Sequence, residues 1–186
     1  MTKKQSPPMI YQLKVTLQYS KPPIWRRLEV PGNTSLAKLH DIIQLAMGWT
    51  DSHLHWFIFG EKRYSNPDFQ LDDVVDEGQI TLADLGFEPK RRFEYEYDFG
   101  DGWGHDILIE KVTEPEPEVR YPRCVKGKLA CPPDDCGGIG GYYALLDAIS
   151  DPNNPEHENM LEWIGGEYDP EMFDLAAVNK QLWSLR

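Results

Sequence analysis

Residues 93–112 read FEYEYDFGDGWGHDILIEKV and contain the clearest strand pattern in the chain. Aromatic residues alternate with acidic residues over 93–99, which is the two-residue period of a half-buried strand. The dipeptide Asp101-Gly102 that follows is typical of a tight turn between antiparallel strands. The alternating run over 105–112 indicates the returning strand. The sequence therefore predicts a β-hairpin here.

The chain before the hairpin predicts the order strand, strand, helix, strand. Residues 10–19 and 24–30 alternate in the same way and are joined by a short link, so they predict a second hairpin. Apolar residues recur at helical spacing over 36–47, and Gly48 is a natural end for that helix. Residues 54–59 form a compact apolar strand. This order is typical of a β-grasp-like α+β core, in which a helix crosses one face of a mixed or antiparallel sheet.

The chain after the hairpin differs in character. Residues 113–141 contain five prolines, five glycines and all three cysteines, which predicts a long irregular loop. We expect one domain over 10–186 with a disordered N-terminus over 1–9. Helical patterns predict a C-terminal part with helices over 142–150, 156–164 and 170–185.

The chain of 186 residues carries a formal net charge of −12 that is concentrated in its second half. Residues 1–93 hold 12 Lys or Arg against 11 Asp or Glu, whereas residues 94–186 hold 7 against 20. Nucleic-acid affinity depends on cations that neutralise phosphates, so the acidic half disfavours nucleic acid. Short basic pairs such as Arg26-Arg27 indicate ordinary solvated surface, with one nucleic-acid-binding face as the alternative. The acidic half is better suited to a cation or a basic partner protein.

The sequence gives no sign of membrane attachment. No stretch approaches the roughly 20 apolar residues that span a bilayer. Residues 1–8 have no apolar stretch behind them, so they are not typical of a signal peptide. We therefore expect a cytoplasmic protein with no membrane contact, in which the cysteines are reduced.

Several motifs together resemble the plasmid pRiA4b ORF-3-like family over nearly the whole chain, from about residue 10 to 182. They are, in chain order, Pro23-Ile24-Trp25-Arg26-Arg27, Leu39-His40, Gly48-Trp49, His53-Leu54, Tyr97-Asp98-Phe99-Gly100-Asp101 with Trp103 and His105, Tyr121-Pro122-Arg123-Cys124, Pro132-Pro133-Asp134-Asp135-Cys136-Gly137-Gly138 with Gly141-Tyr142, and Asp169-Pro170-Glu171-Met172-Phe173-Asp174. The resemblance implies an α+β fold and a link to plasmids and insertion elements. It implies no assigned activity. Relatives commonly have Glu-Asp where this chain has Asp134-Asp135, a change that keeps the charge.

The residues that carry chemistry are concentrated in the hairpin and the Cys-containing loop. We expect a site where these two segments meet. If the returning strand pairs closely, Asp98 and His105 lie near each other, and the carboxylate orients the imidazole. The polar members of the site are Asp98, Asp101, His105, Cys124, Cys131, Asp134, Asp135 and Cys136.

His40 lies outside these two segments, on or beside the apolar stripe of the predicted helix. It is interpreted as a packed histidine rather than a ligand or base.

A zinc site is the first hypothesis for this cluster. Cys124, Cys131 and Cys136 supply three thiolates, and His105 completes a tetrahedral set. Their spacing is not the paired C-x2-C form, so the alternative is that the cysteines are small, partly buried side chains.

A metal-dependent hydrolase is the second hypothesis, with a phosphodiester or nucleotide as substrate. Asp98, Asp101, Asp134 and Asp135 would hold Mg²⁺ or Mn²⁺, with His105 as general base. The alternative is turn chemistry, because aspartates commonly accept hydrogen bonds from nearby amides. Attack by a Cys136 thiolate is a further, weaker possibility.

A binding module is the third hypothesis. Trp103 and Tyr142 supply aromatic surface for a small ligand or a protein partner, and Gly137 and Gly138 let the backbone approach it closely. The alternative is that most aromatic residues fill the core. We interpret the chain as an accessory or interaction protein with a ligand, cation or partner at the junction of hairpin and Cys-containing loop, and the hydrolase as its alternative.

Overall fold

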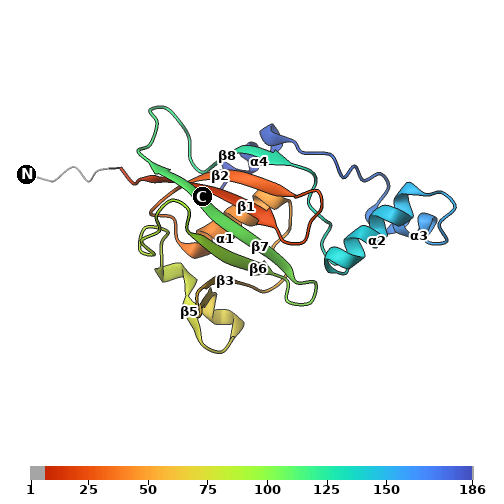
Figure 1. Ribbon diagram of the computed structural model, residues 1–186, viewed down its shortest axis with the longest axis horizontal. Coiled ribbons are helices and arrows are strands. Elements are labelled where there is room, and N and C mark those ends of the chain that lie inside the picture. The colour runs from red at the N-terminus through yellow and green to blue at the C-terminus, as the bar shows by residue number, and fades with distance from the viewer. Residues whose placement is uncertain (1–6, 186) are drawn as a thin grey trace, which may run out of the picture.

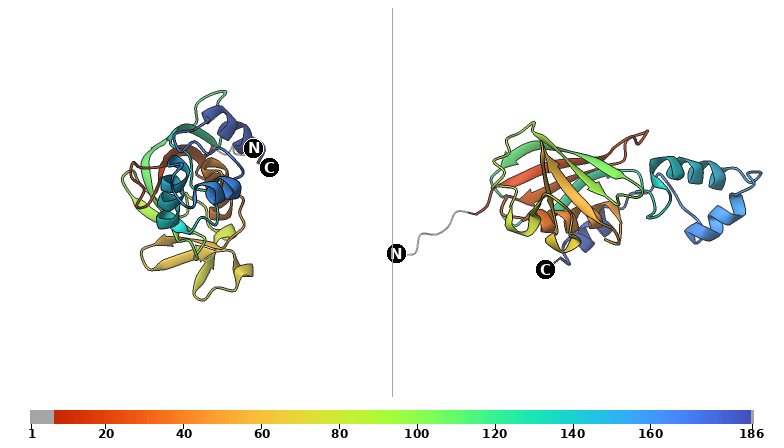
Figure 2. Two further views of the ribbon diagram at one scale, coloured as in Figure 1. Left: turned by 90° about the vertical axis from the view of Figure 1, so that its right-hand side faces the viewer. Right: turned by 90° about the horizontal axis from the view of Figure 1, so that it is seen from below.

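A computed structural model describes residues 7–185 of the chain. Its centre is an eight-stranded mixed sheet with helix α1 across one face (Figures 1 and 2). The α+β class expected from the sequence is confirmed. The regular elements are β1 (Ile10–Leu17), β2 (Trp25–Pro31), α1 (Leu36–Met47), β3 (His55–Phe59), β4 (Lys62–Ser65), β5 (Val74–Asp76), β6 (Arg92–Tyr97), β7 (Trp103–Thr113), β8 (Arg123–Lys128), α2 (Gly138–Ser150), α3 (His157–Ile164) and α4 (Leu175–Leu182), with short 3-10 turns η1 (Pro67–Phe69) and η2 (Glu77–Gln79).

The predicted hairpin lies in the middle of the sheet. The strand order is β5-β4-β3-β6-β7-β1-β2-β8, so β6 and β7 separate β1 from β3. Tyr95 pairs with His105 and Tyr97 pairs with Trp103 across the antiparallel ladder. Neighbouring strands are antiparallel except β4 and β5, which are parallel. The inner positions of the hairpin therefore belong to the core.

The core forms between the sheet and α1. Leu13, Tyr95 and Ile107 are fully buried on the sheet, and Leu39 and Ile43 are fully buried on the helix. Burial of side chains this size is worth about 1.5–3 kcal/mol each and is the main force that holds the two layers together. The sequence places these residues by the period of two in strands and of 3.6 in the helix.

Local capping explains why α1 begins and ends where it does. The side chain of Ser35 accepts a hydrogen bond from the amide of Lys38 (3.2 Å), which satisfies one free donor of the first turn. Gly48 adopts a left-handed φ of 102° at the other end, and its amide donates to Gln44. The buried guanidinium of Arg26 donates through Nε to the Ala46 carbonyl (2.8 Å), so a cation covers the negative end of the helix.

Two sequence expectations need correction. Residues 113–141 are not irregular throughout, because β8 pairs with β2 at the sheet edge. Only Cys124 is buried in that strand, so it lacks the apolar alternation that reveals a strand in sequence. The last helix does not start at residue 170: the Asp174 side chain caps the Ala177 amide (2.9 Å) and starts α4 at Leu175.

The expected disordered segment 1–9 is only partly covered, because residues 1–6 lie outside the described residues. The carbonyl of Met9 accepts a hydrogen bond from the Gly32 amide (2.7 Å) just before β1 begins. Among residues 7–185, no helix is both long and apolar enough to cross a membrane.

The turn of the β6–β7 hairpin packs directly against the start of α2. The Gly137 amide donates to Oδ2 of Asp101 (3.0 Å). Gly138 has a left-handed φ of 67°, and a Cβ added to it would lie 2.4 Å from the carbonyl oxygen of Asp101. The left-handed φ and the short distance both require glycine at residue 138. Any other residue would be strained in this backbone conformation, and its Cβ would clash with the Asp101 carbonyl.

We expect Gly138→Ala to lower the free energy of unfolding by about 1–3 kcal/mol, because it combines backbone strain with a steric clash. The control is Gly140→Ala in the same helix, where an added Cβ meets no atom within 4 Å. That variant should be as stable as the wild type or up to about 1 kcal/mol more stable. Urea unfolding followed by fluorescence measures both, and equal stability of the two variants would contradict the packing described here.

Candidate functional site

Three connecting segments meet in the structure: the loop 48–54 after α1, the hairpin turn 98–102 and the Cys-containing loop 131–137. The hydroxyl of Thr50 donates to Oδ2 of Asp134 (3.1 Å), and this bond ties the first segment to the third. The Asp101–Gly137 bond ties the second segment to the third. The junction is therefore built by contacts between residues that are far apart in the chain.

Asp98 uses its two carboxylate oxygens for different tasks. It has a left-handed φ of 55°, and its Oδ1 accepts hydrogen bonds from the amides of Gly100 (2.9 Å) and Asp101 (3.3 Å). These bonds stabilise the turn in the way expected of aspartate. Its Oδ2 lies 3.7 Å from Nε2 of His53. One oxygen thus holds the turn, and the other faces the junction.

His53 brings a second carboxylate into the same place. Its Nε2 lies 3.1 Å from Oδ1 of Asp135, but this approach does not have hydrogen-bond geometry and the buried Nε2 has no hydrogen-bond partner. The ligand atoms of His53, Asp98 and Asp135 all lie within 4.8 Å of one another. One imidazole nitrogen and two carboxylate oxygens from three segments therefore converge.

This cluster opens onto a polar cavity. His53 and Asp98 line a cavity of about 570 Å³, together with Asp51, His55 and Glu77. Asp135 is the exposed member of the cluster, with 69% of its side chain accessible to solvent. An ion held by the three side chains would therefore be reached from the cavity.

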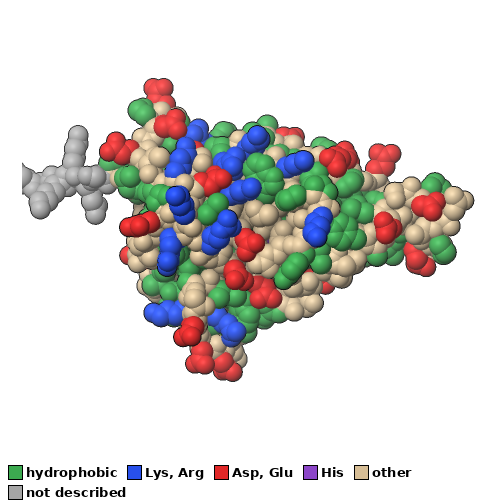
Figure 3. All heavy atoms as spheres, in the orientation of Figure 1, with side chains coloured by type: hydrophobic (Ala, Val, Ile, Leu, Met, Phe, Trp, Pro, Cys, Tyr) green, Lys and Arg blue, Asp and Glu red, His purple; other side chains and the backbone are tan. Residues whose placement is uncertain are grey.

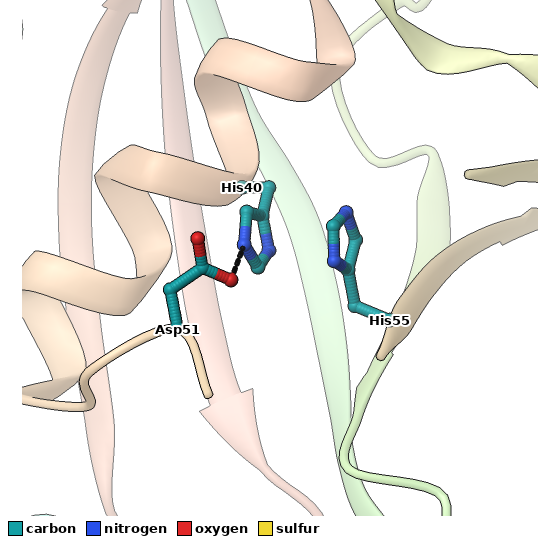
Figure 4. Close-up of side chains that lie close together, drawn as sticks. All are labelled: His40, Asp51 and His55. Atoms are coloured by element: carbon teal, nitrogen blue, oxygen red, sulfur yellow. Dashed lines mark hydrogen bonds and ion pairs between the residues drawn. The ribbon is translucent and has the colours of Figure 1, made fainter. Parts of the chain in front are cut away.

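A second group of ligand atoms lies deeper, and Figure 4 shows its members His40, Asp51 and His55. The imidazoles of His40 on α1 and His55 on β3 are stacked face to face, with ring centroids 3.4 Å apart and planes 7° apart. An imidazole binds a metal through a lone pair in its ring plane, at about 2.0–2.1 Å for zinc. One ion cannot lie in two parallel planes that far apart, so the stacked rings are not arranged to share a metal.

A cyclic network of hydrogen bonds satisfies both ring nitrogens of His40. The Asp51 amide donates to Oε1 of Gln44 (3.0 Å), which leaves the Gln44 amide group to donate to the Tyr95 oxygen (3.0 Å). The Tyr95 hydroxyl then donates to Nδ1 of His40 (2.8 Å), and Nε2–H of His40 donates to Asp51 (2.7 Å). Both ring nitrogens are occupied in this arrangement. His40 is the packed, hydrogen-bonded residue expected from the sequence.

The electrostatics agree with a neutral His40. Burial, and then the neighbouring His55, lower the pKa of His40 from 6.5 to about 4. His55 itself forms a buried pair with Glu77, with 2.9 Å between Nε2 and Oε2. These side chains form the inner wall of the cavity rather than its open site.

The structure does not bring His105 together with the cysteines. Among the described residues, the ligand atoms of these four side chains form no convergent group. His105 is fully buried, its Nδ1 donates to the Tyr95 carbonyl (3.3 Å), and its ring packs edge-on against Trp49. Burial raises the pKa of Cys124, raises that of Cys136 to about 12 and raises that of Cys131 furthest, so the thiols are protonated. The thiols therefore have neither a shared ligand geometry nor thiolate character.

The other predicted site residues serve the fold around the junction. Trp103 is buried and its ring packs against that of Trp49, and Tyr142 is buried and accepts a hydrogen bond from Tyr168 (3.3 Å). Gly137 and Gly138 form the close contact with the hairpin turn. Asp101 and Asp134 bind backbone amides at Gly137 (3.0 Å) and Thr50 (3.4 Å). Of the predicted acidic residues, Asp98 and Asp135 are the two that face the convergent cluster.

Sequence reasoning did not select the residues of the loop 48–54 and of η2 that line the cavity. The signal for the loop was the spacing Asp51-x-His53-x-His55, in which three potential ligands occur within five residues directly after a helix. Nothing comparable marks Glu77, because its pairing with His55 is produced by the tertiary fold alone.

The buried His105 predicts a pH dependence of stability. Burial lowers its pKa from 6.5 to about 4, so the unfolded chain binds a proton at this residue in that interval and the folded chain does not. Stability from the neutral ring is complete above pH 6.5 and is lost as the pH falls toward 4, up to about 3 kcal/mol. Urea unfolding between pH 7 and pH 5 should show a shallower slope for His105→Gln than for the wild type. The control His157→Gln, on α3, should keep the wild-type slope, and an unchanged slope in His105→Gln would contradict this account.

The chain is similar in sequence and in structure to proteins of unknown function. The chain is 37% identical over 177 residues to the uncharacterised protein y4hQ of Sinorhizobium fredii, which covers 92% of this chain and 89% of that protein. It is also similar to the crystal structure of a protein of unknown function, MM3350 from Methanosarcina mazei Go1, with a TM-score of 0.83 and 34% identity over 92% of this chain and 98% of that one. Residues 9–177 match the model of the plasmid pRiA4b ORF-3-like proteins, and the chain belongs to that family.

Proposed function

We propose that this protein binds a divalent metal ion where the hairpin meets the Cys-containing loop, through His53, Asp98 and Asp135. The observation that carries the proposal is the convergence of their three ligand atoms within 4.8 Å. The buried Nε2 of His53 has no hydrogen-bond partner, so its lone pair is available to an ion. A cation would also relieve the repulsion between two carboxylates that both approach Nε2 of His53.

The donor set selects the kind of ion. Imidazole nitrogen suits zinc and related transition metals, whereas carboxylate oxygen also suits Mg²⁺ and Mn²⁺. One nitrogen and two oxygens fit Zn²⁺ or Mn²⁺ best, and they disfavour Mg²⁺, which prefers an oxygen shell. Water would complete the coordination on the side of the cavity.

Calorimetric titration of the full, chelator-treated protein with Zn²⁺ and with Mn²⁺ tests this proposal. We expect one ion per chain, and at least tenfold weaker binding in His53→Ala, because this variant removes the only nitrogen ligand. Asp98→Asn should weaken binding as well, while its Oδ1 still accepts the turn amides.

His157→Ala is the matched control, because it removes an imidazole on α3 that lies outside the cluster. It should bind the metal as the wild type does. Wild-type protein that binds neither ion at submillimolar concentration, or His53→Ala binding as tightly as the wild type, would refute the site.

A metal-dependent hydrolase is the second candidate function, and the cavity of about 570 Å³ beside the cluster favours it. His105 cannot act as the base there because it is fully buried in the core. Asp51 lines the same cavity as His53 and Asp98 and is hydrogen-bonded to His40, so we propose this carboxylate as the general base of the second candidate function.

Hydrolysis of bis(p-nitrophenyl) phosphate, with Mn²⁺ or Zn²⁺ added, tests the second candidate. We expect turnover that requires the metal, is abolished in His53→Ala and falls at least a hundredfold in Asp51→Asn. Metal binding without turnover above the rate of the metal in buffer would leave this protein a metal-binding protein and reject the hydrolase.

A further inference from the structure

Helices α2 and α3 project from one end of the sheet, as Figures 1 and 2 show. We call residues 138–171 the acidic arm. They contain eight Asp or Glu and no Lys or Arg. On the face seen in Figure 3, the arm shows red and green side chains among tan atoms and no blue ones.

The acidic arm contains an apolar cleft between its two helices. Leu145 and Ala148 of α2 and Met160 and Trp163 of α3 line a cleft of about 570 Å³. No residue of α3 is fully buried, although the helix carries a methionine, a leucine, a tryptophan and an isoleucine. Met160, Leu161 and Ile164 are half-buried and Trp163 is exposed, so the apolar face of α3 is only partly covered by the rest of the chain.

Trp163 is the most conspicuous side chain of the cleft. It is 47% exposed, whereas Trp103 and Trp49 in the core are 1% and 5% exposed. Exposed tryptophan beside an apolar cleft is typical of the central contact of a protein interface, because a single indole buries a large area.

Carboxylates line this cleft, so a partner that covers it should be positively charged. Asp135, Asp147 and Glu156 line its edges, and the arm has no Lys or Arg to pair with them. These carboxylates would repel an acidic or polyanionic partner. A segment that carries Lys or Arg beside its apolar residues would satisfy both surfaces.

We propose that the cleft of the acidic arm docks an amphipathic, basic segment of a partner protein, with Trp163 and Met160 as its apolar contacts. Apolar side chains of the partner fill the cleft, and its cations face Asp147 and Glu156. This mode corresponds to a helix lying in a groove, in which anchors on one helix face enter apolar pockets. The proposal does not depend on metal binding at His53.

A fluorescein-labelled, 15-residue helical peptide of Leu and Lys is the probe, and its binding to the full chain is followed by anisotropy. A peptide with every Leu replaced by Ser keeps the same charge and controls for simple electrostatic attraction. We expect the Leu/Lys peptide to bind at least tenfold more tightly than the Ser/Lys peptide at 150 mM salt.

Variants then locate the site. Trp163→Ala should weaken binding of the Leu/Lys peptide at least tenfold. The control Trp183→Ala removes a 38% exposed tryptophan after α4, outside the cleft, and should not weaken it. Asp147→Asn with Glu156→Gln should weaken binding and reduce its salt dependence, whereas the exposed control pair Asp72→Asn with Glu88→Gln should not.

Three results would overturn the proposal. The first is equal binding of the Leu/Lys peptide to Trp163→Ala and to the wild type. The second is equal binding of the Ser/Lys and Leu/Lys peptides, which would mean that electrostatic attraction alone explains the binding. The third is a wild-type dimer in sedimentation experiments that Trp163→Ala abolishes, because the cleft would then be covered by a second copy of this chain.

Discussion

The backbone of Asp98 turns the chain at the end of β6, and the junction depends on that turn. Its left-handed φ of 55° would be costly for a side chain with no local partner, but Oδ1 accepts the amides of Gly100 and Asp101 and compensates for the strain. This bonding leaves Oδ2 facing His53, and the same turn places Asp101 against Gly137. Asp98 thus holds the hairpin turn with one carboxylate oxygen and presents the other, a candidate metal ligand, to His53.

The sequence predicts the elements that have clean periodicity. The alternation over 93–99, the Asp-Gly turn and the apolar stripe over 36–47 correspond to β6, the hairpin turn and α1. It does not predict that the hairpin lies between β1 and β3, because the order of strands in a sheet depends on pairing between distant segments. It also misses β8, where polar residues form an edge strand with little apolar surface.

The candidate site is only partly predictable for the same reason. Asp98 and Asp135 can be selected from the sequence because their residue type and their motifs mark the hairpin and the Cys-containing loop as the segments that carry chemistry. The contribution of His53 does not, because it depends on how the loop after α1 packs against both segments. The cysteines and His105 show the opposite error: residue types typical of metal ligands are used here as packed side chains, with His105 and Cys124 buried and Cys131 and Cys136 half-buried. Residue type suggests a ligand, and only tertiary geometry decides whether its lone pair is free.

The coordination of a divalent metal ion by His53, Asp98 and Asp135, as proposed above, can be observed directly in a crystal. Anomalous diffraction at the zinc absorption edge, on crystals of the full chain soaked in Zn²⁺, tests it most directly. We expect one peak at about 2.0–2.2 Å from Nε2 of His53 and from a carboxylate oxygen of each aspartate. A peak at Cys131 or Cys136, or no peak at the junction, would contradict it.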